Sequence, residues 1–229
     1  MMRSYGRILC ITLLSAIIPV ASADYQSDLE DWFNSDDDKD FENILAINEG
    51  QLNFLIKPPD QPVHHHQNKL IISNTSLDDG WISLQQCHYN MDNFPRVEVV
   101  YSPERIRKLE IVSSKNIELA WVENGSVQLV NVAKGASLCV KAESRALSQN
   151  IDGSYTLKNG PFMRKFLDGY FPMHVSIDIK LPKQLEFASV SPAQQAGFAV
   201  SNQADAIHLD AWFEGRLKTV LQLKQRKLN

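Results

Sequence analysis

The chain has 229 residues, of which 44% are hydrophobic and 22% are charged, and its formal net charge is -4. This composition excludes a fully disordered chain, a collagen-like repeat and a polytopic membrane protein. The negative charge also argues against nucleic acid as a partner, because binding to phosphate needs a basic surface.

The first 23 residues have the pattern of a secretory signal peptide. Arg3 and Arg7 form a basic start, an apolar run covers 8–20, and Ala-Ser-Ala over 21–23 supplies the small residues before a cleavage site. The run is short for a membrane span, and Cys10 lies inside it, which disfavours a lipoprotein signal. We therefore expect an exported protein, periplasmic or secreted, with no transmembrane segment after cleavage. Export is a stronger reason than charge to exclude nucleic acid.

An acidic segment over 24–50 follows the signal. It contains ten acidic residues and one base, Lys39, with apolar residues such as Trp32 and Phe33 at helical spacing. We predict a mobile terminus or two short helices. The alternative is a segment that docks on a partner through Trp32 and Phe33.

Short strand-like runs dominate residues 51–143, which predicts a β-sandwich domain. The clearest unit is a hairpin over 117–122 and 127–132, because Asn124-Gly125 between them favours a type I′ turn. An immunoglobulin-like architecture is a guess only. The tyrosine expected two residues before the second cysteine of such a domain is Ser137 here.

The cysteines of the exported chain are Cys87 and Cys139, since Cys10 leaves with the signal. An even pair in an exported protein predicts one disulfide. A metal-binding or catalytic thiol is the alternative, but the chain has no Cys-x-x-Cys spacing.

Residues 154–226 follow a polar connector and form a smaller β-unit that we expect to pack on the first domain. Strand patterns recur over 174–180, 185–190, 206–213 and 216–223. One short helix is expected between Phe162 and Asp168, where Gly169 would end it. The predicted fold class is thus mainly β, a sandwich plus a smaller packed β-unit with one short helix.

Three adjacent histidines, His64 to His66, follow a proline-rich stretch that we expect to be an exposed connector. In an extended chain His64 and His66 point the same way, so they can share a divalent metal, with His88 or Asp60 as a third ligand. A polar loop without a metal is the favoured interpretation, because histidine tracts are weak evidence. No other cofactor is expected.

Four aromatic residues and a charged pair lie within one short segment, which can line a groove for a glycan or a peptide. They can also form a hydrophobic plug between the two β-units, which is the commoner use of such clusters. The candidate ligand-binding residues are Phe162, Arg164, Phe166, Asp168, Tyr170 and Phe171.

Catalytic motifs are absent from the sequence: there is no Gly-x-Ser-x-Gly, His-Glu-x-x-His or phosphate-binding glycine loop. A Ser–His–Asp set assembled from distant positions stays open, with His174 and His208 as the available bases. The leading hypothesis is a non-enzymatic binding or assembly protein of the cell envelope that recognises a protein or a glycan. Metal binding through the triplet and a dispersed hydrolase are the alternatives.

Overall fold

The structure is a computed structural model that describes residues 50–226. The predicted signal peptide (1–23) and all but the last residue of the acidic segment (24–50) lie outside the described residues. Within residues 50–226 the helix is α3 (Ser76–Asp79), and no helix in this range is long and apolar enough to span a membrane.

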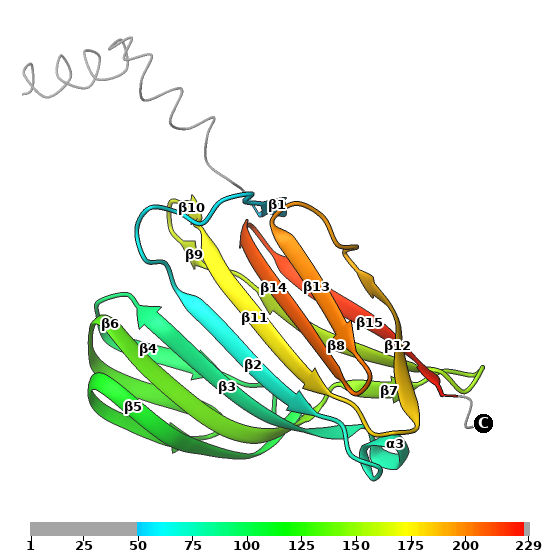
Figure 1. The fold of residues 1–229 in the computed structure, drawn as a ribbon. Coiled ribbons are helices and arrows are strands. Elements are labelled where there is room, and N and C mark those ends of the chain that lie inside the picture. Colours follow the sequence, from blue (N-terminus) through cyan, green and yellow to red (C-terminus); the bar gives the residue numbers. More distant parts are fainter. Residues whose placement is uncertain (1–49, 227–229) are drawn as a thin grey trace, which may run out of the picture. The chain divides into compact units, whose positions relative to one another are not determined.

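Two β-sheets make up almost all of the described chain (Figure 1). The strands of the larger, sheet A, lie in the order β1 (Asn53–Phe54), β14 (Ala206–Glu214), β11 (Met173–Lys180), β2 (His65–Ile71), β3 (Trp81–Met91), β6 (Ser126–Arg145) and β4 (Phe94–Val100), with β13 (Phe198–Gln203) on β14 and β5 (Ile106–Glu123) on β6. Sheet B has the order β12 (Leu185–Ser191), β15 (Leu217–Gln225), β8 (Tyr155–Phe162) and β7 (Leu147–Gln149), and β9 (Lys165–Phe166) pairs with β10 (Gly169–Tyr170).

Sheet A joins strands from both predicted ranges, 51–143 and 154–226. Strand β11 pairs antiparallel with β14 and parallel with β2, so His174 lies beside His65 on one side and Trp212 on the other. Strand β2 pairs in turn with β3. Two pairs of strands that are distant in sequence, β2 with β3 and β11 with β14, thereby form the middle of one sheet.

The two sheets pack face to face over a shared core, which confirms a mainly β, sandwich-type fold. On β11 the inward residues Val175, Ile177 and Ile179 are at most 2% exposed, and they alternate with outward polar residues, as predicted for a half-buried strand. They pack with Leu157 and Leu221 of sheet B in one cluster of buried residues. A second cluster lies under β4, β5 and β6 and includes Val127, Leu129 and Leu138.

The predicted hairpin and disulfide are both present. Glu123 faces Ser126, and Asn124 and Gly125 have φ angles of 49° and 79°, as a type I′ turn requires. Cys87 and Cys139 are direct cross-strand partners on β3 and β6 and are joined by a disulfide with a Cα–Cα distance of 4.1 Å. The immunoglobulin-like detail is not confirmed, because this disulfide joins two strands of one sheet rather than two sheets.

The helix expected between Phe162 and Asp168 is wrong. The chain is extended there: Phe162 ends β8, and β9 and β10 form a small hairpin in which Lys165 faces Tyr170. The i,i+4 spacing of the aromatic and charged residues was misleading, since Phe162 is held by the ladder of sheet B. Only α3 is helical among the described residues.

Candidate functional site

The histidine triplet lies at the start of the central strand β2, so the expectation of a polar loop is wrong, whereas the proline-rich stretch before it is largely exposed and outside the strands, as expected. His65 pairs with Tyr89 on β3 and with His174 on β11. Alternation along the strand sends His66 inward, where it is 9% exposed, and His65 outward. The triplet therefore contributes to two different faces of sheet A.

On the inner face the structure brings together the three histidines proposed as metal ligands. His64 Nε2 lies 3.0 Å from His88 Nδ1, and the rings of His66 and His88 meet edge to face with centroids 4.6 Å apart. His66 also hydrogen-bonds Asn68 through Nε2 at 3.0 Å. Burial lowers the pKa of His64 to about 4 and that of His66 to about 3, and it lowers the pKa of His88 as well. Neutral imidazoles are the form that binds metals.

These rings contact each other rather than surround a common point. Among residues 50–226 no three His, Cys, Asp or Glu side chains are arranged to hold a metal ion. Asp60, the other expected ligand, is not part of a metal-holding group with these histidines among the described residues. Metal binding at this cluster would require the rings to turn.

The aromatic segment divides between core and surface. Phe162 and Tyr170 are 5% and 6% exposed, and Phe162 packs edge to face on His66. The Tyr170 hydroxyl accepts a hydrogen bond from Arg216 Nε at 2.6 Å. Phe162 and Tyr170 therefore pack in the interior of the fold.

Arg164 pairs with Asp92, not with Asp168. Its Nη2 and Nε donate to the two Asp92 carboxylate oxygens at 2.8 and 3.1 Å. Its guanidinium carbon lies 5.2 Å from the ring centroid of Phe166 and 5.7 Å from that of Phe171. Asp168 is exposed at the tip of the hairpin. Asp92, the partner that completes this cluster, carried no signal in the sequence.

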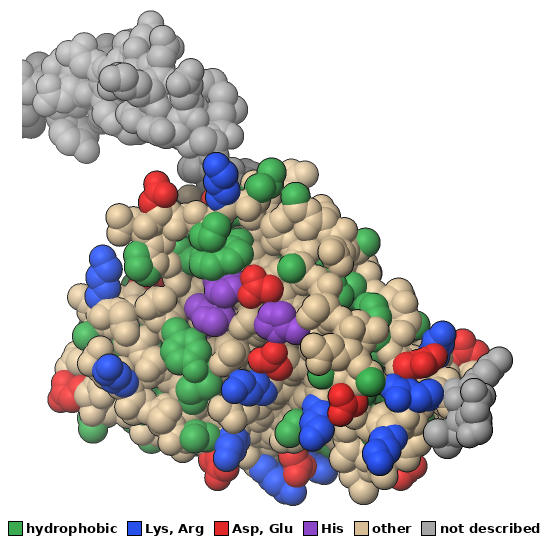
Figure 2. Space-filling model, in the orientation of Figure 1, with side chains coloured by type: hydrophobic (Ala, Val, Ile, Leu, Met, Phe, Trp, Pro, Cys, Tyr) green, Lys and Arg blue, Asp and Glu red, His purple; other side chains and the backbone are tan. Residues whose placement is uncertain are grey.

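A row of four stacked rings crosses the outer face of sheet A, one from each central strand. We define the ring row as Tyr89, His65, His174 and Trp212. The centroids of His65 and His174 are 4.1 Å apart, as are those of His174 and Trp212, and the latter two rings are almost parallel. Tyr89 adds a tilted contact with His65 at 5.6 Å. All four residues are partly exposed, and Figure 2 shows histidines gathered beside hydrophobic and acidic side chains on this face.

Two aspartates pair with the histidines of this face. His174 Nε2 lies 2.8 Å from Asp210 Oδ2, and His208 Nδ1 lies 2.7 Å from Asp178 Oδ1. Burial raises the pKa of Asp210, but the hydrogen bond and positive charge of His174 outweigh it, so the pKa stays below its usual value. The two bases considered for a hydrolase are thus each held by a carboxylate.

A serine also contacts the ring row, although not in a catalytic arrangement. Ser176 Oγ lies 2.7 Å from His65 Nε2, while the carboxylate of Asp210 bonds to His174 instead. A triad needs one histidine between the serine and the acid. Ser176 is also only 4% exposed. Burial and the positive charge of His174 lower the pKa of His65 to about 4, which weakens it as a base at neutral pH.

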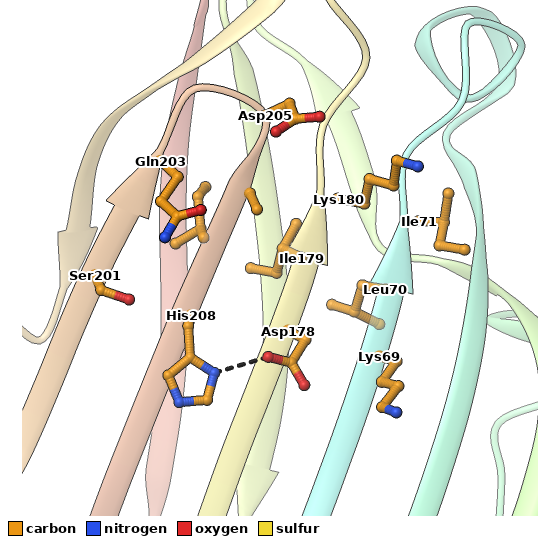
Figure 3. A pocket seen from close by; sticks show the side chains of 12 residues that line it. Lys69, Leu70, Ile71, Asp178, Ile179, Lys180, Ser201, Gln203, Asp205 and His208 are labelled. Carbon is orange, nitrogen blue, oxygen red and sulfur yellow. Dashed lines mark hydrogen bonds and ion pairs between the residues drawn. The ribbon is translucent and has the colours of Figure 1, made fainter.

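A groove of about 550 Å³ continues from the ring row along the same face. Its polar side chains come from four strands or the turns between them, and Figure 3 shows them projecting from the sheet, with the His208–Asp178 bond between neighbouring strands. Two lysines, two aspartates, a histidine, a serine and a glutamine line it: Lys69, Lys180, Asp178, Asp205, His208, Ser201 and Gln203. The charges of the lysines and aspartates balance. This groove could not be predicted from the sequence, because its residues become neighbours only through the β2–β11–β14–β13 pairing.

No protein-family model and no curated protein matches this chain. Among solved structures, a two-domain M1 zinc metallopeptidase mutant bound to L-tryptophan matches with 13% sequence identity and a TM-score of 0.36. The match covers 76% of this chain and 43% of that chain. So low a TM-score carries no argument about the fold or the function of this protein.

Proposed function

We propose that the protein is an exported, non-enzymatic binding protein of the cell envelope, and that it binds a glycan on the outer face of sheet A. The observation that carries this proposal is the charge-balanced groove beside the ring row. A neutral sugar offers hydroxyl groups that both donate and accept hydrogen bonds, and the groove supplies both kinds of partner. The ring row adds apolar surface with polar ring edges, which is typical of binding sites.

A glycan fits this face better than an extended peptide. Strands β2, β11 and β14 each have a neighbour on both sides, so their backbone groups are already paired. A peptide that adds a strand to a sheet needs a free edge. Recognition over these three strands must therefore use side chains, and side chains of both charges with amide and hydroxyl groups suit a polyhydroxylated ligand. Among the strands that line the groove, β13, which pairs with β14 alone, is the one with an unpaired edge.

Two features support export. The first 23 residues have the pattern of a signal peptide, and the chain contains a cross-strand disulfide between Cys87 and Cys139. Disulfides persist in oxidising compartments such as the periplasm and the extracellular space.

The proposal is tested by glycan-array screening of the full exported chain, followed by calorimetry on the glycans that bind. Lys69→Ala and Gln203→Ala should each weaken binding about tenfold, because each removes hydrogen bonds in the groove. Lys218→Ala, which removes an exposed lysine from sheet B, is the matched control and should bind as the wild type does. Binding that is equal in all four proteins would contradict the proposed site. Recovery of shortened glycan would contradict a non-enzymatic role.

The second candidate function is divalent-metal binding at His64, His66 and His88. The specific observation in its favour is that three neutral imidazoles meet on the inner face of sheet A. Metal analysis of untagged protein, purified without chelators and then dialysed against zinc, should find close to one equivalent if the cluster binds. His88→Gln should abolish this binding, whereas His208→Gln should leave it unchanged. Less than a tenth of an equivalent in the wild type would remove this candidate.

A further inference from the structure

A second cavity, of about 240 Å³, lies on the inner side of sheet A. Strands β2 and β3 contribute His66, Asn68 and Gln86, all of them buried, and Tyr101 and Asn159 contribute from the end of β4 and from β8. Inward and outward residues alternate on β2, so this cavity and the groove of the proposed glycan site lie on opposite faces of the strand. The two sites are independent of each other.

The charge of this cavity is positive. Arg105 and Lys158 are exposed residues in its lining, and the lining includes no aspartate or glutamate among the described residues. His66 adds no charge at neutral pH, because burial lowers its pKa to about 3. The other polar lining residues are serines, amides and a tyrosine. An anion placed here would meet two cations and no carboxylate.

Two lining residues carry buried polar atoms without a hydrogen-bond partner within residues 50–226: Tyr101 Oη and Asn159 Nδ2. The Asn159 Oδ1 atom already accepts from Asn68 Nδ2 at 3.3 Å and from the Gly160 backbone N–H at 3.1 Å, so the unsatisfied group is the donor. Burial raises the pKa of Tyr101, so its hydroxyl keeps its proton and can donate. Leaving such groups unsatisfied is costly, and an acceptor that reaches them from the cavity, with a small shift of the side chains, would satisfy both.

We propose that this cavity is a binding site for a small oxyanion, a carboxylate or a phosphate, which accepts hydrogen bonds from Tyr101 and Asn159 and whose charge is balanced by Arg105 and Lys158. Hydrogen bonds between such donors and a carboxylate or phosphate are stronger than those between neutral groups. The volume corresponds to about eight water molecules, which is enough for a four-carbon dicarboxylate or a phosphate and too small for an oligosaccharide.

The test is calorimetric titration of the full exported chain with acetate, succinate and inorganic phosphate, each as its sodium salt. Acetamide and succinamide are the neutral controls of matched shape. At least one anion should bind with a Kd below about 1 mM, and where that anion is acetate or succinate the corresponding amide should bind at least about tenfold more weakly. The comparison of the carboxylates with phosphate identifies the head group that the cavity prefers.

Two variants connect this binding to the cavity. Tyr101→Phe should weaken anion binding about tenfold or more, without lowering the melting temperature of the anion-free protein, because it removes an unsatisfied hydroxyl. Arg105→Gln should also weaken binding, and Arg107→Gln is its control, since Arg107 pairs with Glu143 and does not line the cavity.

The proposal is overturned if no anion binds below 1 mM, if the amides bind as tightly as the anions, or if both Tyr101→Phe and Arg105→Gln bind as the wild type does. Lys69→Ala, which alters the outer groove, should leave anion binding unchanged. Failure of the glycan proposal is therefore distinguishable from failure of this one.

Discussion

Lowering the pH from 7 to 5 should destabilise the fold through the histidines on the inner face of sheet A. In the folded state burial lowers the pKa of His66 to about 3, whereas the ordinary value in an unfolded chain is 6.5. Between these two values the unfolded state binds a proton that the folded state excludes. The free energy of unfolding therefore falls as the pH falls through 6.5 and continues to fall toward 3.

The magnitude follows from the two pKa values of His66. At pH 7 the unfolded imidazole is mostly neutral, so the contribution is small. At pH 5 the unfolded imidazole is almost fully protonated and the folded one is neutral, which gives a loss of about 2 kcal/mol relative to pH 7. His64 and His88 act with the same sign, because burial lowers the pKa of both.

Urea denaturation at the two pH values measures this loss, and His66→Gln is the informative variant. Glutamine cannot titrate and can still donate to Asn68. The pH-dependent loss in this variant should be smaller than in the wild type by about 2 kcal/mol. The control is His208→Gln, because His208 is partly exposed and paired with Asp178. Its pH-dependent loss should stay within about 0.5 kcal/mol of the wild-type loss.

The quantity compared is the change in the free energy of unfolding between pH 7 and pH 5 within each protein. Any stability that a substitution already costs at pH 7 therefore cancels. Asp210, which bonds to His174, interferes little, since its pKa lies below its ordinary value and therefore outside this pH window. If His66→Gln loses as much stability between pH 7 and 5 as the wild type does, His66 is not buried in its neutral form. The assignment of the inner histidine cluster would then be wrong.

Three further predictions concern stability. Replacing Cys87 and Cys139 by serine should lower the free energy of unfolding by about 4 kcal/mol, since their disulfide closes a loop with a sequence separation of 52; urea denaturation of the reduced wild type should give the same loss. Leu157→Ala should cost about 2–5 kcal/mol because the side chain is fully buried, whereas Leu167→Ala at the exposed hairpin tip should change urea stability by less than about 0.5 kcal/mol. Asp92→Asn should lower the free energy of unfolding by about 1 kcal/mol, because it removes the ion pair with Arg164. A double-mutant cycle of Asp92 and Arg164 should show a coupling energy of similar size.

Local signals in the sequence predicted much of the fold. The alternation over 174–180 predicted β11, the Asn-Gly turn predicted the hairpin of β5 and β6, and the even cysteine count predicted the disulfide. The expected strand over 127–132 is only part of the 20-residue strand β6, which continues past Gly135, a residue with a positive φ of 77°. The hydrophobic pattern of a sequence does not distinguish a bend within one strand from the end of that strand.

The candidate site was predicted only in fragments. Alternation correctly suggested that His64 and His66 share a side, and His88 does lie beside them. The ring row was not predicted, because it joins β3, β2, β11 and β14 through non-local pairing, including the parallel contact of β2 and β11. No spacing along a single chain encodes that register. For the same reason the Arg164–Asp92 pair, separated by 72 residues, was missed.

The inner face of β2 and β3 departs from the pattern that sets their register, and this departure coincides with the inner histidine cluster and the inner cavity, not with the groove on the outer face. Leu70 and Ile82 are buried and apolar, as inward positions of a central strand should be. Farther along the same strands the inward positions are polar instead, and all of them are buried: His66, Asn68, Gln86 and His88. Burying four polar side chains side by side costs stability unless each finds a partner, and apolar residues would have stabilised the register equally well. Because breaks in an otherwise consistent pattern concentrate at functional sites, this polar half of the β2–β3 face is where substitutions should separate function from stability.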